Sequence, residues 1–236
     1  LKLEPDNQVA LYQLVQLAVH ANDYPKVADI CTRAIMHYPE QLPYYFYLGF
    51  SYYQLERQDK ALDVFRKGVR QIKPDTDHGI VADMYSIMGD LYYSNGLKDS
   101  AFIAYDSCLV YNPENVGCLN NYAYYLSLEK AELKKAELMS AKTVELEPKN
   151  STYLDTYAWI LYQQGNYSLA KFYIEKAVDN LPKGDESGVV LEHYGDILWM
   201  TRNDEKALLM WQKSFDAGNK TDDIKRKIEN KGWKRE

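Results

Sequence analysis

Three aspartates, Asp83, Asp90 and Asp155, are the residues whose chemistry could serve catalysis as general acids or bases. Each lies in a stretch that we expect to be helical, and carboxylates on helix surfaces are usually solvated. A catalytic carboxylate needs a burying pocket that shifts its pKa, and a sequence does not reveal such a pocket. An enzyme that uses these carboxylates therefore remains an alternative hypothesis, and we assign no catalytic residue.

The histidines and cysteines do not indicate a metal site. The four histidines lie far apart, without a carboxylate or cysteine at metal-ligand spacing, so we expect ordinary surface or partly buried side chains at His20, His37, His78 and His193. Three cysteines are too few and too irregularly spaced for a disulfide framework. Phosphate-binding, dinucleotide-binding and nucleophile-elbow motifs do not occur. We therefore predict neither a metal nor a cofactor.

The composition limits the partners that the chain can have. Among 236 residues, 28 Lys and Arg face 34 Asp and Glu, which gives a net charge of −6 and argues against nucleic acid as the main partner. Charged and amide residues interrupt every apolar stretch before the roughly 18 residues that a membrane-spanning helix needs. The function must therefore come from a protein surface.

The 22 tyrosines by themselves would favour β-structure, but their spacing does not. The stretch 42–55, with five tyrosines and two phenylalanines, lacks the alternation of apolar and polar residues that strands show. It is also longer than a typical strand of roughly 4–8 residues. The pattern therefore indicates helices.

Two ladders of residues reveal an internal repeat. The first consists of six prolines at intervals of 34, 35, 39, 35 and 34 residues: Pro5, Pro39, Pro74, Pro113, Pro148 and Pro182. Proline ends a helix because it lacks the amide donor and clashes with the preceding turn. In the second ladder, Gly49, Gly89 and Gly195 are each followed after 12 residues by an alanine and after 16 by an aromatic residue. Glycine inside a helix costs roughly 1 kcal/mol relative to alanine, and close contact between antiparallel helices explains its presence.

This pattern resembles the tetratricopeptide repeat family, whose unit is a helix–turn–helix of about 34 residues. The resemblance covers residues 1–218 and implies an all-α, right-handed α-solenoid of six helix pairs. The repeats are expected at residues 8–41, 42–75, 80–115, 116–150, 151–184 and 187–218. Insertions near residues 74–81 and 183–187 predict longer loops.

The spacing also predicts the helices within each repeat. The first helices are expected at about residues 8–20, 42–55, 80–94, 116–128, 151–163 and 188–201. The second helices are expected at about residues 24–37, 58–71, 98–111, 132–146, 167–180 and 204–216.

The two ends of the repeat array differ. Thr221 followed by two aspartates is typical of a helix start, so residues 219–236 should form a capping helix, at about 221–230, and a tail. Residues 1–7 resemble the end of a repeat, as Leu146–Asn150 does, and we interpret them as the tail of a preceding repeat in a longer protein. A short leader that happens to look like a repeat end is the alternative. If a repeat is missing, the first pair should expose Leu11, Leu14 or Leu17.

In the family that the chain resembles, the first helices line a concave groove that holds peptides or helices of partner proteins. Carried over by position, the groove contains aromatic, acidic and small polar residues but neither Lys nor Arg. We expect about half of these side chains to pack between neighbouring repeats. The main candidates are Tyr12, Phe46, Phe50, Tyr53, Asp83, Asp90, Asn120, Tyr124, Asp155, Trp159, Tyr162, Glu192, Asp196 and Trp199.

The resemblance implies a non-catalytic scaffold that binds a partner peptide or helix, and a self-assembly module is the alternative. Three carboxylates and three aromatic residues of the C-terminal half should select a peptide with Lys or Arg beside apolar anchors, whereas acidic peptides should bind poorly. These residues are Asp155, Glu192, Asp196, Trp159, Tyr162 and Trp199.

Residues 119–126, 153–162 and 191–198 look like the C-terminal repeats of bacterial cell-envelope tetratricopeptide proteins. That resemblance implies a location in the bacterial periplasm or at the outer membrane, with an export signal upstream of Leu1.

Overall fold

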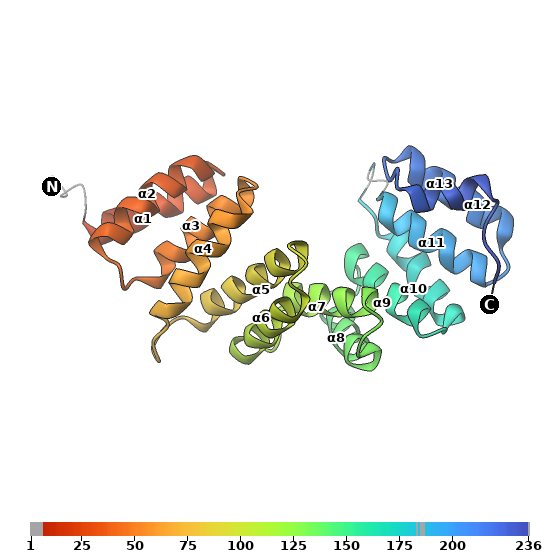
Figure 1. Cartoon of the computed structure of the whole chain (residues 1–236), viewed down its shortest axis with the longest axis horizontal. Helices are drawn as coiled ribbons and strands as arrows, with labels where there is room; N and C mark the ends of the chain where they lie inside the picture. The colour runs from red at the N-terminus through yellow and green to blue at the C-terminus, as the bar shows by residue number, and fades with distance from the viewer. Residues whose placement is uncertain (1–6, 183, 185–186, 236) are drawn as a thin grey trace. The chain divides into compact units, whose positions relative to one another are not determined.

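The computed structural model describes residues 7–182, 184 and 187–235, which form thirteen α-helices, one 3₁₀ turn and no strand (Figure 1). The first helices of the pairs are α1 (Gln8–His20), α3 (Leu42–Gln54), α5 (His78–Ser94), α7 (Val116–Leu128), α9 (Ser151–Gln163) and α11 (Gly188–Met200). The second helices are α2 (Tyr24–His37), α4 (Gln58–Gly68), α6 (Lys98–Tyr111), α8 (Leu133–Leu146), α10 (Tyr167–Asp179) and α12 (Asp204–Asp216), and α13 (Asp222–Glu229) follows. The expected all-α fold of six helix pairs and a final helix is confirmed.

Helix ends agree with the sequence-based expectation within two residues, with one exception. The α-helix α4 ends at Gly68, and the chain continues as the 3₁₀ turn η1 (Val69–Gln71). Helix α5 begins two residues early because the Asp77 carboxylate accepts hydrogen bonds from the amides of Gly79 (2.7 Å) and Ile80 (3.3 Å). The loop at 183–187 lies largely outside the described residues, as do residues 1–6.

The chain divides into two compact units, with the boundary inside α7. Unit 1 ends at Cys118 and has an apolar core in which Leu11, Phe65 and Met84 are fully buried. Unit 2 begins at Leu119, and its core contains the buried Leu161 and Trp211. Within the described residues, no helix is both long enough and apolar enough to cross a bilayer.

The glycine ladder marks where paired helices touch. A Cβ atom added to Gly49, Gly89 or Gly195 would overlap the aromatic ring that follows 16 residues later, in each case on the second helix of the same pair. These rings belong to Phe65, Tyr105 and Trp211. The ring therefore lies directly against the backbone of the first helix, which explains why a helix interior retains glycine there.

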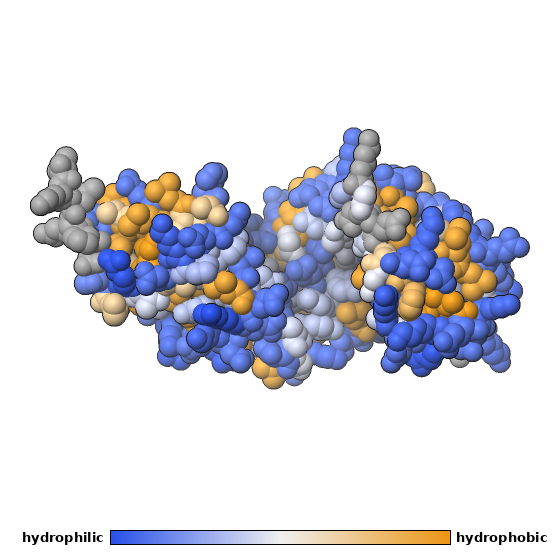
Figure 2. Space-filling view, turned by 90° about the horizontal axis from the view of Figure 1, so that it is seen from above, coloured by the Kyte–Doolittle hydropathy of each residue, from blue (hydrophilic) through white to orange (hydrophobic). Residues whose placement is uncertain are grey.

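Of the three leucines expected to be exposed on α1, only two are exposed. Leu14 and Leu17 are exposed (41% and 66%), and Figure 2 shows apolar surface at this end of unit 1. Leu11 does not belong to this face, because it is fully buried in the core against α2. Leu48, one period after Leu14, is buried where the preceding second helix covers α3.

We predict that Gly195→Ala destabilises the protein although alanine is the better helix former. The added methyl group must displace the Trp211 ring, and overpacking of this kind costs about 1–3 kcal/mol. Gly117→Ala is the matched control, because that glycine is exposed on α7 and its added Cβ meets no close neighbour. The control should gain up to about 1 kcal/mol from helix propensity. Urea unfolding followed by circular dichroism measures both, and equal stability of the two variants would contradict the packing argument.

Candidate functional site

All fourteen predicted groove residues lie on first helices, but they differ in how far their side chains are exposed to solvent. Only Tyr12 and Asp83 are exposed. Four are buried, namely Asn120, Asp155, Asp196 and Trp199. The rest are half-buried: Phe46, Phe50, Tyr53, Asp90, Tyr124, Trp159, Tyr162 and Glu192.

In unit 1, rings from α1 and α3 form what we call the aromatic surface: Tyr12, Phe46, Tyr47, Phe50 and Tyr53. Phe46 and Phe50 stack with their centroids 6.0 Å apart and their planes 18° apart. Tyr47 meets the Tyr12 ring edge-on at 6.4 Å, and its hydroxyl accepts a hydrogen bond of 2.9 Å from the Gln16 amide. Sequence analysis missed Tyr47, because only its contact with the preceding first helix reveals its role.

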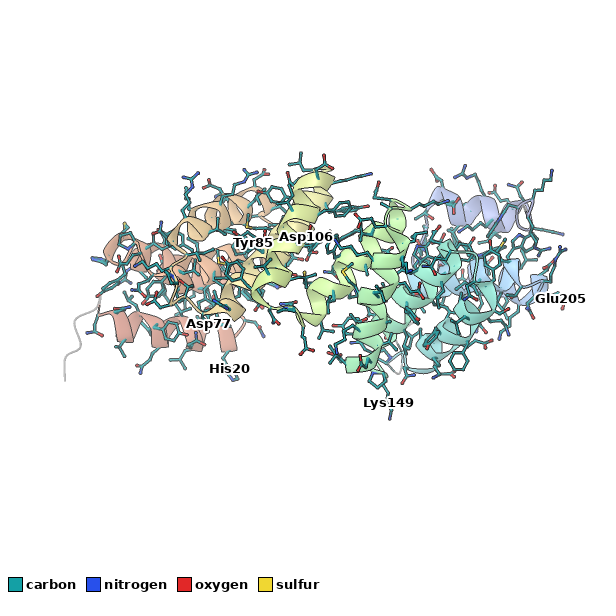
Figure 3. The ribbon with its side chains drawn as sticks, turned by 90° about the horizontal axis from the view of Figure 1, so that it is seen from below. His20, Asp77, Tyr85, Asp106, Lys149 and Glu205 are labelled. Atoms are coloured by element: carbon teal, nitrogen blue, oxygen red, sulfur yellow. The ribbon has the colours of Figure 1, made fainter. Side chains whose placement is uncertain are left out.

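Two carboxylates of α5 accept hydrogen bonds from other parts of the chain. Asp83 accepts a 2.8 Å hydrogen bond from the Asn115 amide, and Asp90 accepts one of 2.5 Å from the Tyr105 hydroxyl. Burial raises the pKa of Asp83, and the hydrogen bond from Asn115 opposes that effect. The Tyr12 hydroxyl also has a raised pKa, caused by burial, by Tyr47 and by the negative charge of Asp77 at the start of α5 (Figure 3). The ring of α1 therefore lies within electrostatic reach of α5.

In unit 2, Asp155 and His193 form a buried pair. The His193 Nδ1 lies 2.9 Å and 3.1 Å from the two Asp155 carboxylate oxygens. The indole of Trp159 stacks on the imidazole at 4.0 Å, and Tyr162 stacks on Trp159 at 4.9 Å. The expectations of a solvated carboxylate and an ordinary histidine are both wrong, because each group satisfies the other between α9 and α11.

This buried pair has a counterpart in unit 1. Tyr47 and His193 hold the same position in their helices, two residues before the ladder glycines Gly49 and Gly195. Each side chain reaches back to the preceding first helix, Tyr47 to Gln16 and His193 to Asp155. The position thus carries a polar bond between successive first helices in both units, which assigns Asp155 to the scaffold.

The expectation that the inner surface lacks cations is also wrong. Lys227 of α13 extends its ammonium group to Glu192 (2.7 Å) and Asp196 (2.9 Å), and Asp223 of its own helix is 2.8 Å away. Asp196 also accepts a 2.9 Å hydrogen bond from the Trp211 indole. Sequence analysis considered only the six first helices, whereas α13 adds the next helix of the array.

Trp199 also contacts other residues of the same chain. Its ring packs against Trp211 (5.7 Å) and Trp233 (5.8 Å), and the Arg235 guanidinium lies 3.8 Å from its centroid. The carboxylates and the indole that were expected to select a cationic peptide therefore already have cationic partners. The predicted charge selection in the C-terminal half is not supported in this arrangement.

The pKa values of the buried groups follow from these contacts. Burial lowers the pKa of His193, but the charge of Asp155 and its hydrogen bond outweigh burial, so the pKa is raised overall. Burial raises the pKa of Asp196 to about 6 against the lowering effect of Lys227, so this carboxylate is an anion at neutral pH. Burial lowers the pKa of Lys227, whereas Asp196, Asp223 and Glu192 raise it further.

The carboxylates considered as possible acids or bases, and the possible metal ligands, have the following arrangement. Among the described residues, no three His, Cys, Asp or Glu side chains are grouped so that they could hold a metal ion. Asp83, Asp90 and Asp155 are each engaged in hydrogen bonds with a neighbouring side chain.

We predict that Lys227→Met lowers the free energy of unfolding by about 3–5 kcal/mol, because it leaves buried carboxylates without their cation. Lys225→Met on the same helix is the control. Lys225 is exposed and pairs with the exposed Asp222, so its loss should change stability by less than about 0.5 kcal/mol. Chemical unfolding of both variants makes the comparison, and equal losses would show that the Lys227 cluster is not special.

The raised pKa of His193 predicts a pH dependence of stability. A group with a raised folded-state pKa stabilises fully below its unfolded pKa, about 6.5 for histidine, and this contribution is lost as the pH rises through the folded value. The free energy of unfolding should therefore fall as the pH rises above about 6.5 and through the raised pKa of His193. His193→Gln, which can still donate to Asp155, should abolish this fall. His20→Gln, at the exposed end of α1 (Figure 3), should retain it, and an unchanged slope in His193→Gln would disprove the assignment.

Comparison with known proteins agrees with the repeat architecture. A family model of the tetratricopeptide repeat matches residues 152–180. A TPR repeat-containing protein of Pseudomonas aeruginosa is 24% identical over 145 residues, which are 60% of this chain and 22% of that protein. The uncharacterised protein ycf37 of Pyropia yezoensis is 31% identical over 86 residues, which are 36% of this chain and 48% of that protein. The chain therefore spans less than half the length of either relative.

Solved structures share the fold at low sequence identity. The protein YrrB, described as a TPR protein with an unusual peptide-binding site, superimposes with a TM-score of 0.61 at 16% identity, over 79% of this chain and 91% of that one. A chain of the APC/C hetero-tetramer Cut9–Hcn1 gives a TM-score of 0.77 at 11% identity, over 97% of this chain and 43% of that one. The repeat ladder, the helix pairs and the family match at residues 152–180 together identify tetratricopeptide repeats in this chain.

Proposed function

We propose that this chain is a non-catalytic scaffold that binds a segment of a partner protein on the aromatic surface of unit 1. The tetratricopeptide fold supports a role in protein–protein interaction. The choice of unit 1 as the binding surface depends on one observation. The rings of α1 and α3 remain exposed or half-buried, whereas the residues at the same positions of α11 are covered by other parts of the chain.

The chemistry of this surface favours a segment with apolar anchors and at least one cation. Aromatic rings supply large contact areas at a small entropic cost and are enriched where binding energy concentrates. The exposed Asp83 has an amide rather than a cation as its hydrogen-bond donor, so its negative charge is available to a ligand. A Lys or Arg in the partner could pair with Asp83 while its neighbours pack against the rings.

The fold relatives provide supporting analogy. YrrB is described as having a peptide-binding site, and the Cut9 chain was solved in a complex with Hcn1. Identities of 16% and 11% make these likenesses of fold, so the proposal depends on the rings themselves.

We further propose a bacterial cell envelope as the location. This rests on the resemblance of residues 119–126, 153–162 and 191–198 to envelope tetratricopeptide proteins. Fractionation of the source cells, followed by immunodetection of the native protein, tests it.

A random dodecapeptide library displayed on phage and selected on the immobilised chain tests the binding proposal. The selected peptides should contain aromatic or aliphatic residues beside Lys or Arg. Phe50→Ala should weaken their binding, measured by fluorescence anisotropy, by at least about tenfold, as expected for a central contact. Phe172→Ala removes another half-exposed ring, on α10 outside the aromatic surface, and should leave binding unchanged. Equal effects of the two substitutions would contradict the proposal.

A further inference from the structure

The last residues of the chain lie on unit 2 in the manner of a bound peptide. After α13, residues 231–235 have no regular secondary structure, and Figure 1 shows them returning towards the end of α11. Their contacts there are made largely by side chains. We call residues 231–235 the C-terminal tail.

Two side chains of the tail make the main contacts. The Trp233 ring packs at 5.8 Å from Trp199 and 5.3 Å from Trp211, and its carbonyl oxygen accepts a 3.0 Å hydrogen bond from the Trp199 indole. Arg235 lies over the Trp199 ring, donates to the Trp199 carbonyl at 2.8 Å and forms an ion pair with Asp204 at the start of α12. An indole and a guanidinium two residues apart are thus each recognised by specific partners.

The backbone conformation of the tail also requires a particular residue type at one position. Gly232 has φ of +103°, and a Cβ atom at this position would overlap the Trp199 ring. Only glycine allows the chain to pass this close to the indole. The recognised feature is therefore an extended Gly-Trp-x-Arg segment, which Gly232–Arg235 supplies.

The tail does not fill the space beside it. A cleft remains beside the tail. It is lined by Tyr162 of α9, Asp196 of α11, Asp223, Arg226 and Lys227 of α13, Asn230 at the C-terminal end of that helix, and Gly232 and Trp233 of the tail. The Trp233 side of the tail therefore faces a cleft that a competing segment can enter along the Lys227 cluster.

We propose that Trp199, Trp211 and Asp204 form a binding site for an extended Gly-Trp-x-Arg segment of a partner protein, and that the C-terminal tail is its resident, displaceable occupant. This site is distinct from the aromatic surface of unit 1. A tethered segment competes at an effective concentration of the order of millimolar, so the intact chain should bind micromolar peptide weakly. A chain whose tail lacks its two anchors should bind the same peptide well.

The probe is a fluorescein-labelled peptide, Lys-Gly-Trp-Lys-Arg, with the sequence of residues 231–235 and blocked ends. Anisotropy titrations compare the intact chain with the double variant Trp233→Ala, Arg235→Ala, and with Gly232→Val as a second way of releasing the tail. Circular dichroism establishes that each variant is folded. Each emptied variant should bind the peptide at least tenfold more tightly than the intact chain.

Matched controls test whether the peptide binds through Asp204 and through its own tryptophan. Within the double variant, Asp204→Lys should weaken binding at least tenfold, whereas Glu205→Lys, the adjacent acidic residue of the same helix turn (Figure 3), should not. A peptide with alanine in place of tryptophan should lose binding. Failure of both folded emptied variants to bind, or equal binding of the alanine peptide, overturns the proposal. Binding to the aromatic surface of unit 1 is tested separately by Phe50→Ala, so the two proposals can fail independently.

Discussion

In three helix pairs, the backbone of the first helix comes into contact with an aromatic ring of the second, at Gly49, Gly89 and Gly195. This contact sets the distance between the paired helices, because a helix cannot approach a ring so closely where a Cβ atom intervenes. Once each pair has this spacing, its outer residues can pack against the next pair. The buried cores of both units depend on this local constraint.

A second layer of contacts connects successive first helices, and it is polar. Tyr47 and His193 hold equivalent positions and bond to the preceding first helix, at Gln16 in unit 1 and at Asp155 in unit 2. Buried polar groups are costly unless they are paired, so the buried His193–Asp155 pair favours one register of α9 and α11 over others. The same physics explains why carboxylates that look like ligand groups in the sequence turn out to be structural in unit 2.

The two units use their first helices differently. In unit 1 the rings of α1 and α3 remain partly exposed, and Asp83 on α5 is exposed as well. In unit 2 the corresponding residues of α11 are occupied by Lys227, Trp233 and Arg235. A basic and aromatic segment is the type of ligand that sequence analysis expected there, and the chain itself provides it. The expected binding of such a segment from another molecule is not supported at α11, because Lys227, Trp233 and Arg235 of the same chain already contact these residues.

The sequence by itself determined the repeat, the helix pairs and nearly every helix end, because proline breaks, caps and the glycine–aromatic spacing act within one repeat. It also indicated which helix faces point inwards. Only the tertiary structure decided which of the predicted groove residues remain accessible to a partner. Lys227 lies 31 residues beyond Asp196, and His193 lies 38 beyond Asp155, so no local pattern pairs them. Their pairing depends on how closely neighbouring repeats pack, and that packing determines whether a carboxylate meets water, a ligand or a cation of its own chain.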